Sequence, residues 1–135
     1  MSGEEIAGGR EKTVLVYLRL HKRLDDSLTR FGEQTGMPRA SALRWILERW
    51  IASVPSGEEG EAAPEKDLPL SRIGEDYILA RGRTEEGSLL GRGIRLTMKQ
   101  STERRLNLIA WRAGIRPSEL RTLILADYLQ IVGLL

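Results

Sequence analysis

The chain contains no cysteine and only one histidine, His21, among its 135 residues. Without cysteine there are no disulfides and no thiolate metal sites, and a single histidine cannot by itself form a histidine metal site or a charge-relay triad. No spacing of serine, lysine or glutamate places a nucleophile, a base and an oxyanion donor together. The GxG at Gly91 to Gly93 lacks the rest of a nucleotide-binding fingerprint. We therefore expect neither an enzyme nor a protein that binds a metal or a cofactor.

Long apolar runs are also missing. The most apolar stretch, 123–135, is interrupted by Asp127 and Gln130, and the first twelve residues are acidic and glycine-rich without an apolar core. The sequence therefore predicts no membrane segment and a cytoplasmic protein.

Charge is sorted along the chain although the net charge is only +2. Residues 12–51 hold eight Lys or Arg against four Asp or Glu, and residues 92–135 hold eight against three. The intervening residues 52–91 hold four against nine. Two basic blocks on either side of an acidic one are compatible with a nucleic-acid partner, which the net charge alone would not indicate.

The apolar pattern of the first basic block recurs in the second at a constant offset of 78 residues without a gap. Positions that agree in kind include Val16 with Ile94, Leu28 with Leu106, Gly36 with Gly114, and Ile46 with Ile124. In each copy a strict alternation precedes a helical spacing, which predicts one strand followed by two helices. The alternation directs one set of side chains inward: Val14, Val16, Leu18, Leu20, Ile94, Leu96 and Met98. It directs the other set outward: Leu15, Tyr17, Arg19, Gly93, Arg95 and Thr97.

Helix signals follow each strand. Leu24, Leu28 and Phe31 form the stripe of a short helix that Gly36 can close, with Asp25 and Asp26 suited to its first turn. The second helix is predicted over 39–53 and its counterpart over about 117–132, each with a proline near its start.

Four segments result. Residues 1–11 form a flexible N-terminus, 12–53 the first unit, 54–91 an acidic linker and 92–135 the second unit. Apolar residues near 68–80 predict some structure within the linker, where a partner protein could also dock, and we expect Gly91 to Gly93 to free the chain before the second strand. The consecutive Leu123, Ile124 and Leu125, with Ile131 and Val132 beyond them, predict self-association through the last helix.

This order of elements resembles the ribbon-helix-helix family of the Arc and methionine repressors over residues 13–53 and 92–132. Two patterns carry the resemblance. The strand-to-helix junction has apolar residues at steps of four, in Leu20, Leu24 and Leu28 and in Met98, Thr102 and Leu106, and the glycine turn with its helix appears in GMPRASALRWILERW and GIRPSELRTLILADYL. Thr102 departs from the apolar rule, and we expect it to soften its helix.

The resemblance implies a mainly α fold with short β-strands, a β-α-α arrangement that occurs twice, and a two-stranded antiparallel ribbon. Since both strands lie in one chain, we expect an intramolecular pseudo-dimer. A linker of about 38 residues has a reach near 35 Å and keeps the second unit at roughly millimolar effective concentration. A swapped dimer, in which each copy pairs with its twin in another chain, is the alternative.

The resemblance also implies that the ribbon enters the major groove of double-stranded DNA and that its outward side chains read the bases. These are Tyr17, Arg19, Arg95 and Thr97, with Leu15 and Gly93 at the outer end. Phosphate contacts through backbone N–H groups are implied at the start of the second helix of each unit, at Arg39 and Ala40 and at Ser118 and Glu119. The nearby cationic side chains add candidates for salt-dependent phosphate contacts: Arg39, Arg116, Lys22, Arg23 and Lys99.

The function implied is that of a transcriptional repressor or regulator. A plasmid or conjugation accessory protein that organises DNA, an antitoxin, and a scaffold that uses the fold only for oligomerisation are the alternatives.

Overall fold

The structure is a computed structural model that describes residues 12–54, 68–78 and 90–135. The flexible N-terminus that the sequence predicts lies outside these residues. The elements, in chain order, are β1 (Thr13–His21), α2 (Lys22–Thr35), α3 (Arg39–Ser53), the 3-10 helix η2 (Arg72–Tyr77), β2 (Leu90–Lys99), α4 (Gln100–Ala113) and α5 (Pro117–Ile131). The prediction of a mainly helical protein with a two-stranded antiparallel sheet is confirmed.

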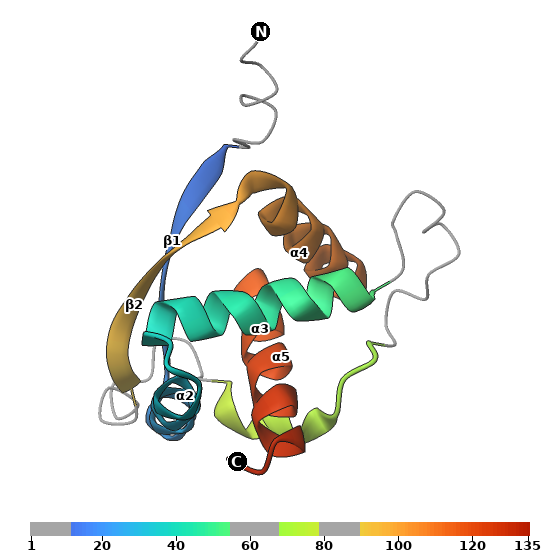
Figure 1. Cartoon of the computed structure of the whole chain (residues 1–135). Helices are drawn as coiled ribbons and strands as arrows, with labels where there is room; N and C mark the ends of the chain where they lie inside the picture. The colour runs from blue at the N-terminus through green and yellow to red at the C-terminus, as the bar shows by residue number, and fades with distance from the viewer. Residues whose placement is uncertain (1–11, 55–67, 79–89) are drawn as a thin grey trace, which may run out of the picture.

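The two strands pair within one chain and lie along one side of the molecule, with the helices on the other (Figure 1). Thr13 faces Lys99, Tyr17 faces Arg95 and Arg19 faces Gly93, and the register shifts between Arg19 and His21. Because side chains alternate across a strand, this register assigns one set of residues to the helices and the other to the outer face.

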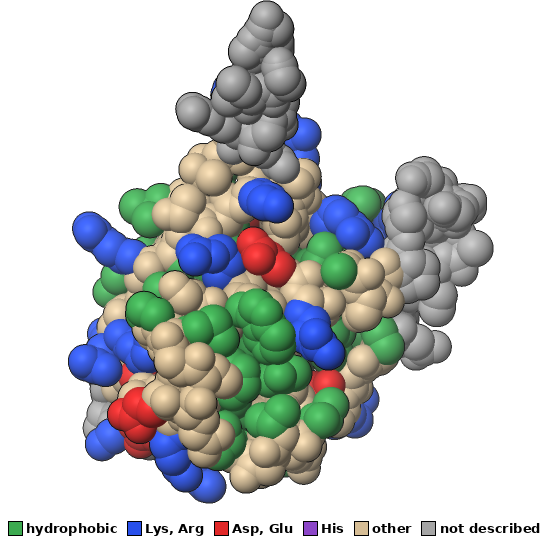
Figure 2. All heavy atoms as spheres, in the orientation of Figure 1, with side chains coloured by type: hydrophobic (Ala, Val, Ile, Leu, Met, Phe, Trp, Pro, Cys, Tyr) green, Lys and Arg blue, Asp and Glu red, His purple; other side chains and the backbone are tan. Residues whose placement is uncertain are grey.

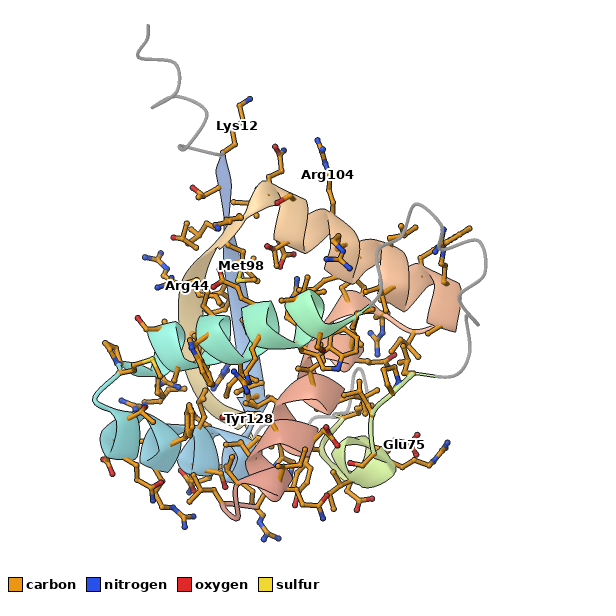
Figure 3. The ribbon with its side chains drawn as sticks, turned by 45° about the vertical axis from the view of Figure 1, so that its right-hand side comes forward. Lys12, Arg44, Glu75, Met98, Arg104 and Tyr128 are labelled. Carbon is orange, nitrogen blue, oxygen red and sulfur yellow. The ribbon has the colours of Figure 1, made fainter. Side chains whose placement is uncertain are left out.

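The helices cover the inner face of the sheet and form one core with it. Leu20, Ile94, Leu96 and Met98 are buried, and Figure 3 shows Met98 on the helix side. The helical part of the core consists of apolar residues from all four α-helices: Leu24, Leu28, Phe31, Ala42, Leu43, Ile46, Leu47, Ile51, Leu106, Ala110, Leu120, Ile124, Leu125, Ala126 and Leu129. Apolar area removed from water contributes about 25 cal/mol per Å² to stability. Separating the two halves would expose this shared core, so each half depends on the other for its stability.

Three aromatic rings join the two halves where α3 passes α5. The ring centroids of Phe31, Trp45 and Tyr128 lie 5.5 to 6.0 Å apart, and the guanidinium of Arg49 lies 5.2 Å from the Trp45 ring centroid. Figure 2 shows a hydrophobic patch over this part of the molecule.

The helix ends follow the repeat. Gly36 and Gly114 end α2 and α4 with φ of 76° and 77°, in the left-handed region that glycine adopts without strain. The helix α4 has 14 residues, as many as α2, so Thr102 does not shorten it. Thr102 is half-buried, and the neighbouring Leu106 and Ala110 supply the buried contacts.

Two further expectations need correction. The strand β2 begins at Leu90, so Gly91 and Gly93 lie within it rather than before it. The three consecutive residues Leu123, Ile124 and Leu125 are buried within the chain, so they are core residues and not a free interface. Ile131 and Val132 remain exposed.

Part of the linker covers α5. The helix η2 packs on α5, and a Cβ added at Gly74 would lie 2.8 Å from the Cα of Leu123. The backbone N–H of Ser71 donates to the Asp127 carboxylate at 3.1 Å. Leu68, Leu70, Ile73 and Tyr77 are partly buried against the core. This part of the linker is therefore folded onto the second half.

None of the helices in the described part of the chain has the length and apolar character needed to cross a membrane.

Candidate nucleic-acid interface

The outer face of the sheet is the surface of β1 and β2 that points away from the helices. It consists of Thr13, Leu15, Tyr17 and Arg19 on β1 and of Gly93, Arg95, Thr97 and Lys99 on β2. All of these except the half-buried Gly93 are exposed, and Leu15 and Tyr17 are 66% and 64% exposed. None of these eight residues is acidic. The structure thus brings together on one surface all four residues that the sequence predicts to contact bases.

Gly93 makes room for Tyr17. A Cβ at Gly93 would lie 2.2 Å from the Tyr17 hydroxyl oxygen and 2.7 Å from its Cζ. The ring of Tyr17 therefore lies across the neighbouring strand, over a position that has no side chain. The sequence indicates only that Gly93 has no side chain to offer, whereas the structure shows what its absence permits.

Arg19 is oriented by the backbone of β2. Its Nε donates to the carbonyl oxygen of Gly91 at 3.0 Å. The two terminal guanidinium nitrogens, which can pair with the O6 and N7 of guanine, are not used by this bond.

Arg95 and Thr97 lie opposite Tyr17 and Leu15 in the ladder. The Thr97 and Leu15 end offers a hydroxyl, methyl groups and the ammonium of Lys99, whereas the Arg19 end offers a guanidinium. The two ends of the outer face therefore differ in chemistry.

Arg44, which the sequence did not indicate as a site residue, is placed beside the sheet by α3 (Figure 3). Its guanidinium donates to the carbonyl oxygen of Thr97 at 3.3 Å. No spacing signal indicated this contact, because it depends on how α3 crosses β2.

The acidic side chain of Asp25 is buried against β2, although the sequence predicted only a favourable place in the first helical turn. One carboxylate oxygen accepts from the Arg39 guanidinium and the other from the backbone N–H of Arg92 at 3.2 Å. Arg39 also donates to the carbonyl oxygen of Gly93 at 3.1 Å. We refer to Asp25, Arg39, Gly91, Arg92 and Gly93 as the Asp25 cluster.

The sequence contained one signal for the importance of Asp25: the offset of 78 aligns it with a second acidic residue, Glu103. In the structure these two are the buried acidic residues of the described part of the chain.

The Asp25 cluster changes the role of Arg39. Its side chain is paired with Asp25 and with β2, so a phosphate at the Arg39 side chain would have to compete with these partners. The backbone N–H groups in the first turn of α3 can still donate to a phosphate. The helix α3 begins after Pro38 without a side-chain cap, and the N–H of Ala40 has no intrahelical acceptor because first-turn N–H groups never have one.

The start of α5 differs from the start of α3. The Glu119 carboxylate accepts from the backbone N–H of Arg116 at 3.0 Å and pairs with its guanidinium at 3.0 Å. A phosphate there would meet a carboxylate that already occupies the helix end, so this pair weakens the phosphate prediction for Arg116 and Glu119. Ser118, beside them, is exposed.

The remaining cationic candidates lie at the N-terminal ends of α2 and α4, where these helices follow the two strands. Lys22, Arg23 and Lys99 are all exposed. The backbone N–H of Arg23 donates to Nδ1 of His21, which caps α2. Partial burial and the positive charge of Arg23 lower the pKa of His21, which favours the neutral ring that this cap requires.

No protein-family model, no curated protein and no solved structure matches this chain.

Proposed function

We propose that this protein binds double-stranded DNA sequence-specifically, with the outer face of its two-stranded sheet in the major groove, and acts as a transcriptional repressor or regulator. The two halves then form a tandem ribbon-helix-helix protein, an intramolecular pseudo-dimer. The observation that carries the proposal is the outer face itself. It is largely exposed and cationic, contains no acidic residue among its eight members, and lies on a sheet whose other face packs against the core.

The dimensions and chemistry of this face fit the groove. The major groove of B-DNA is about 12 Å wide and admits a two-stranded ribbon. Arg19 and Arg95 can pair with guanine, and Thr97 and Leu15 can contact a thymine methyl group. Exposed Lys22, Arg23 and Lys99 add attraction to phosphates that depends on salt.

The fold disfavours the antitoxin alternative. An antitoxin would need a free segment to wrap its toxin, and only residues 54–91 could serve. Residues 68–78 pack on α5 and are therefore engaged.

The test is fluorescence anisotropy with duplex DNA from upstream of the gene, at two salt concentrations, for the wild type and an Arg19→Ala/Arg95→Ala variant. We expect wild-type binding that weakens with salt and prefers specific over scrambled DNA. Loss of a good base contact costs about 1–3 kcal/mol of discrimination, so the variant should lose most of this preference. It should retain weak, salt-dependent binding.

The matched control is Arg72→Ala, which removes one positive charge from η2. Arg72 pairs with Glu75 on an exposed part of the surface. The control should bind DNA as the wild type does. Absence of wild-type binding at low salt, or an unchanged preference in the Arg19/Arg95 variant, contradicts the proposal.

A further inference from the structure

We propose that the Asp25 cluster selects the pairing partner of the first half: it accepts β2, which carries glycine at position 91, and rejects a second copy of β1. This inference concerns assembly and does not depend on DNA binding.

The first step is the fit between Asp25 and Gly91. A Cβ at Gly91 would lie 2.5 Å from Oδ2 of Asp25 and 2.7 Å from its Cβ. The contact with Oδ2 could be relieved by rotating the carboxylate, but Cβ is fixed to the backbone of α2. Any residue larger than glycine at position 91 would therefore force the helix and the strand apart.

The carboxylate is also held in place. Asp25 is 5% exposed, and its two oxygens accept from Arg39 and from the backbone N–H of Arg92. Arg39 in turn donates to the carbonyl oxygen of Gly93. A side chain at position 91 would disrupt hydrogen bonds of a buried charged pair, and such losses are costly.

The repeat shows what a second copy of β1 would bring to this place. In the ladder Tyr17 faces Arg95, and these two positions are equivalent at the offset of 78. A ribbon of two β1 strands in the same register would therefore be symmetric about Tyr17. The residue equivalent to Gly91 at the offset of 78 is Thr13. If a second β1 strand followed the course of β2, including the register shift beside Arg19, Asp25 of each chain would meet Thr13 of the other. The steric conflict would occur twice.

A ribbon of two β2 strands would lack the cluster. Glu103 takes the place of Asp25, and it pairs with Arg121 at 2.6 Å. The residue equivalent to Arg39 is Pro117, which has no side-chain donor, and Arg44 is replaced by Thr122. The hydroxyl of Thr122 donates to the carbonyl oxygen of Ser118 in its own helix. Only the mixed pair thus combines a glycine at position 91 with Asp25, Arg39 and Arg44.

The consequence is a chain that pairs its own two strands and does not form symmetric dimers through either. A covalent linker raises the effective concentration of β2 but does not prevent β1 from pairing with β1 at high protein concentration. The Asp25 cluster supplies that discrimination through shape and hydrogen bonding.

The experiment uses engineered thiols, because the native chain has none. Tyr17→Cys and Arg95→Cys together place two thiols at facing positions of β1 and β2. A short bismaleimide should cross-link them within one chain, and light scattering should give the mass of a monomer. Adding Gly91→Thr should reduce the intrachain cross-linking rate by about tenfold or more, as overpacking of a closely packed site would.

A second variant decides the outcome if Gly91→Thr prevents folding. Asp25→Gly removes both the carboxylate and the Cβ that the new threonine side chain would meet, so adding Asp25→Gly to the Gly91→Thr protein should restore cross-linking to near the rate of Asp25→Gly alone. Failure of this rescue, or wild-type cross-linking in the Gly91→Thr protein, overturns the proposal.

The Tyr17→Cys protein without the second thiol tests the rejected pair. Two β1 strands would bring the introduced thiols of two chains together, so a cross-linked dimer at high protein concentration contradicts the proposal, and its absence supports it.

Discussion

Single residues show most clearly how the two halves differ. Glu103 and Arg121 form an ion pair with both side chains about 10% exposed, and Oε2 of Glu103 and Nε of Arg121 have no hydrogen-bond partner among the described residues. Leu43, a core residue, stands at the position equivalent to Arg121. The second half thus carries a buried charge pair where the first half carries an apolar side chain. Such a pair contributes little net stability, because the attraction is offset by the desolvation of both charges.

Removing one partner of this pair should therefore cost more than removing both. We expect Arg121→Met to lower the free energy of unfolding by about 3–5 kcal/mol, because it leaves the Glu103 carboxylate buried and unpaired. The double variant Glu103→Met/Arg121→Met should recover most of that loss. Urea unfolding measures both. A cost below about 1 kcal/mol for Arg121→Met, as is usual for exposed pairs, would show that the pair is solvated.

Gly93 should act on Tyr17 rather than on stability. In Gly93→Ala the exposed ring of Tyr17 has to rotate away from the new methyl group. We expect the free energy of unfolding to change by less than about 1 kcal/mol, since Tyr17 lies at the surface. Preference for the specific DNA over scrambled DNA should nevertheless fall.

Tyr17→Phe is the comparison for this variant, because it keeps the ring over Gly93 and removes only the hydroxyl. Anisotropy with specific and scrambled duplexes measures both proteins. An unchanged DNA preference in Gly93→Ala would show that the orientation of the Tyr17 ring has no role in recognition.

At the scale of elements, β1 and α2 meet at a titratable cap. His21 ends β1, its Nδ1 accepts from the N–H of Arg23, and its ring packs edge to face on Tyr77 of the linker at 5.2 Å between centroids. Protonation removes the acceptor. The pKa of His21 is lowered in the folded protein, so below the ordinary value of about 6.5 the unfolded chain binds this proton more readily.

The expected result is a stability that is fully present above about pH 6.5 and decreases as the pH falls toward the lower pKa of the folded protein. Urea unfolding at several pH values between about 5.5 and 7.5 measures this slope, in a range where ordinary carboxylates stay ionised. His21→Asn keeps a capping acceptor that does not titrate, and it should remove the slope. An equal slope in both proteins would assign the effect to another group.

The sequence predicted the secondary-structure elements well but missed several contacts between them. Alternation and helical spacing were sufficient for β1, both helix pairs and the inner face, because these patterns depend on local geometry. The roles of Asp25, Arg44 and Gly91 were missed, since each is defined by a contact between residues far apart in the chain. Leu123 to Leu125 was misassigned for a related reason: sequence shows that a stripe is apolar but not that η2 and α3 cover it.

In the whole molecule the element order β1, α2, α3 is followed by β2, α4, α5, and the two halves differ at the surface. The outer face combines Tyr17 and Arg19 from one strand with Arg95 and Thr97 from the other, and the starts of α3 and α5 differ in their caps. Identical subunits recognise palindromes because their contacts are related by symmetry. The proposed function therefore predicts a preference for an asymmetric DNA sequence.

Selection of duplexes from a random library by the full-length wild-type protein and by Arg95→Ala shows whether the outer face reads bases. The proposed function predicts an asymmetric consensus for the wild type and a loss of preference in Arg95→Ala confined to the base pairs that Arg95 contacts. A perfectly palindromic consensus would contradict the asymmetric arrangement. No enriched sequence, or the same consensus for both proteins, would contradict base recognition by this face.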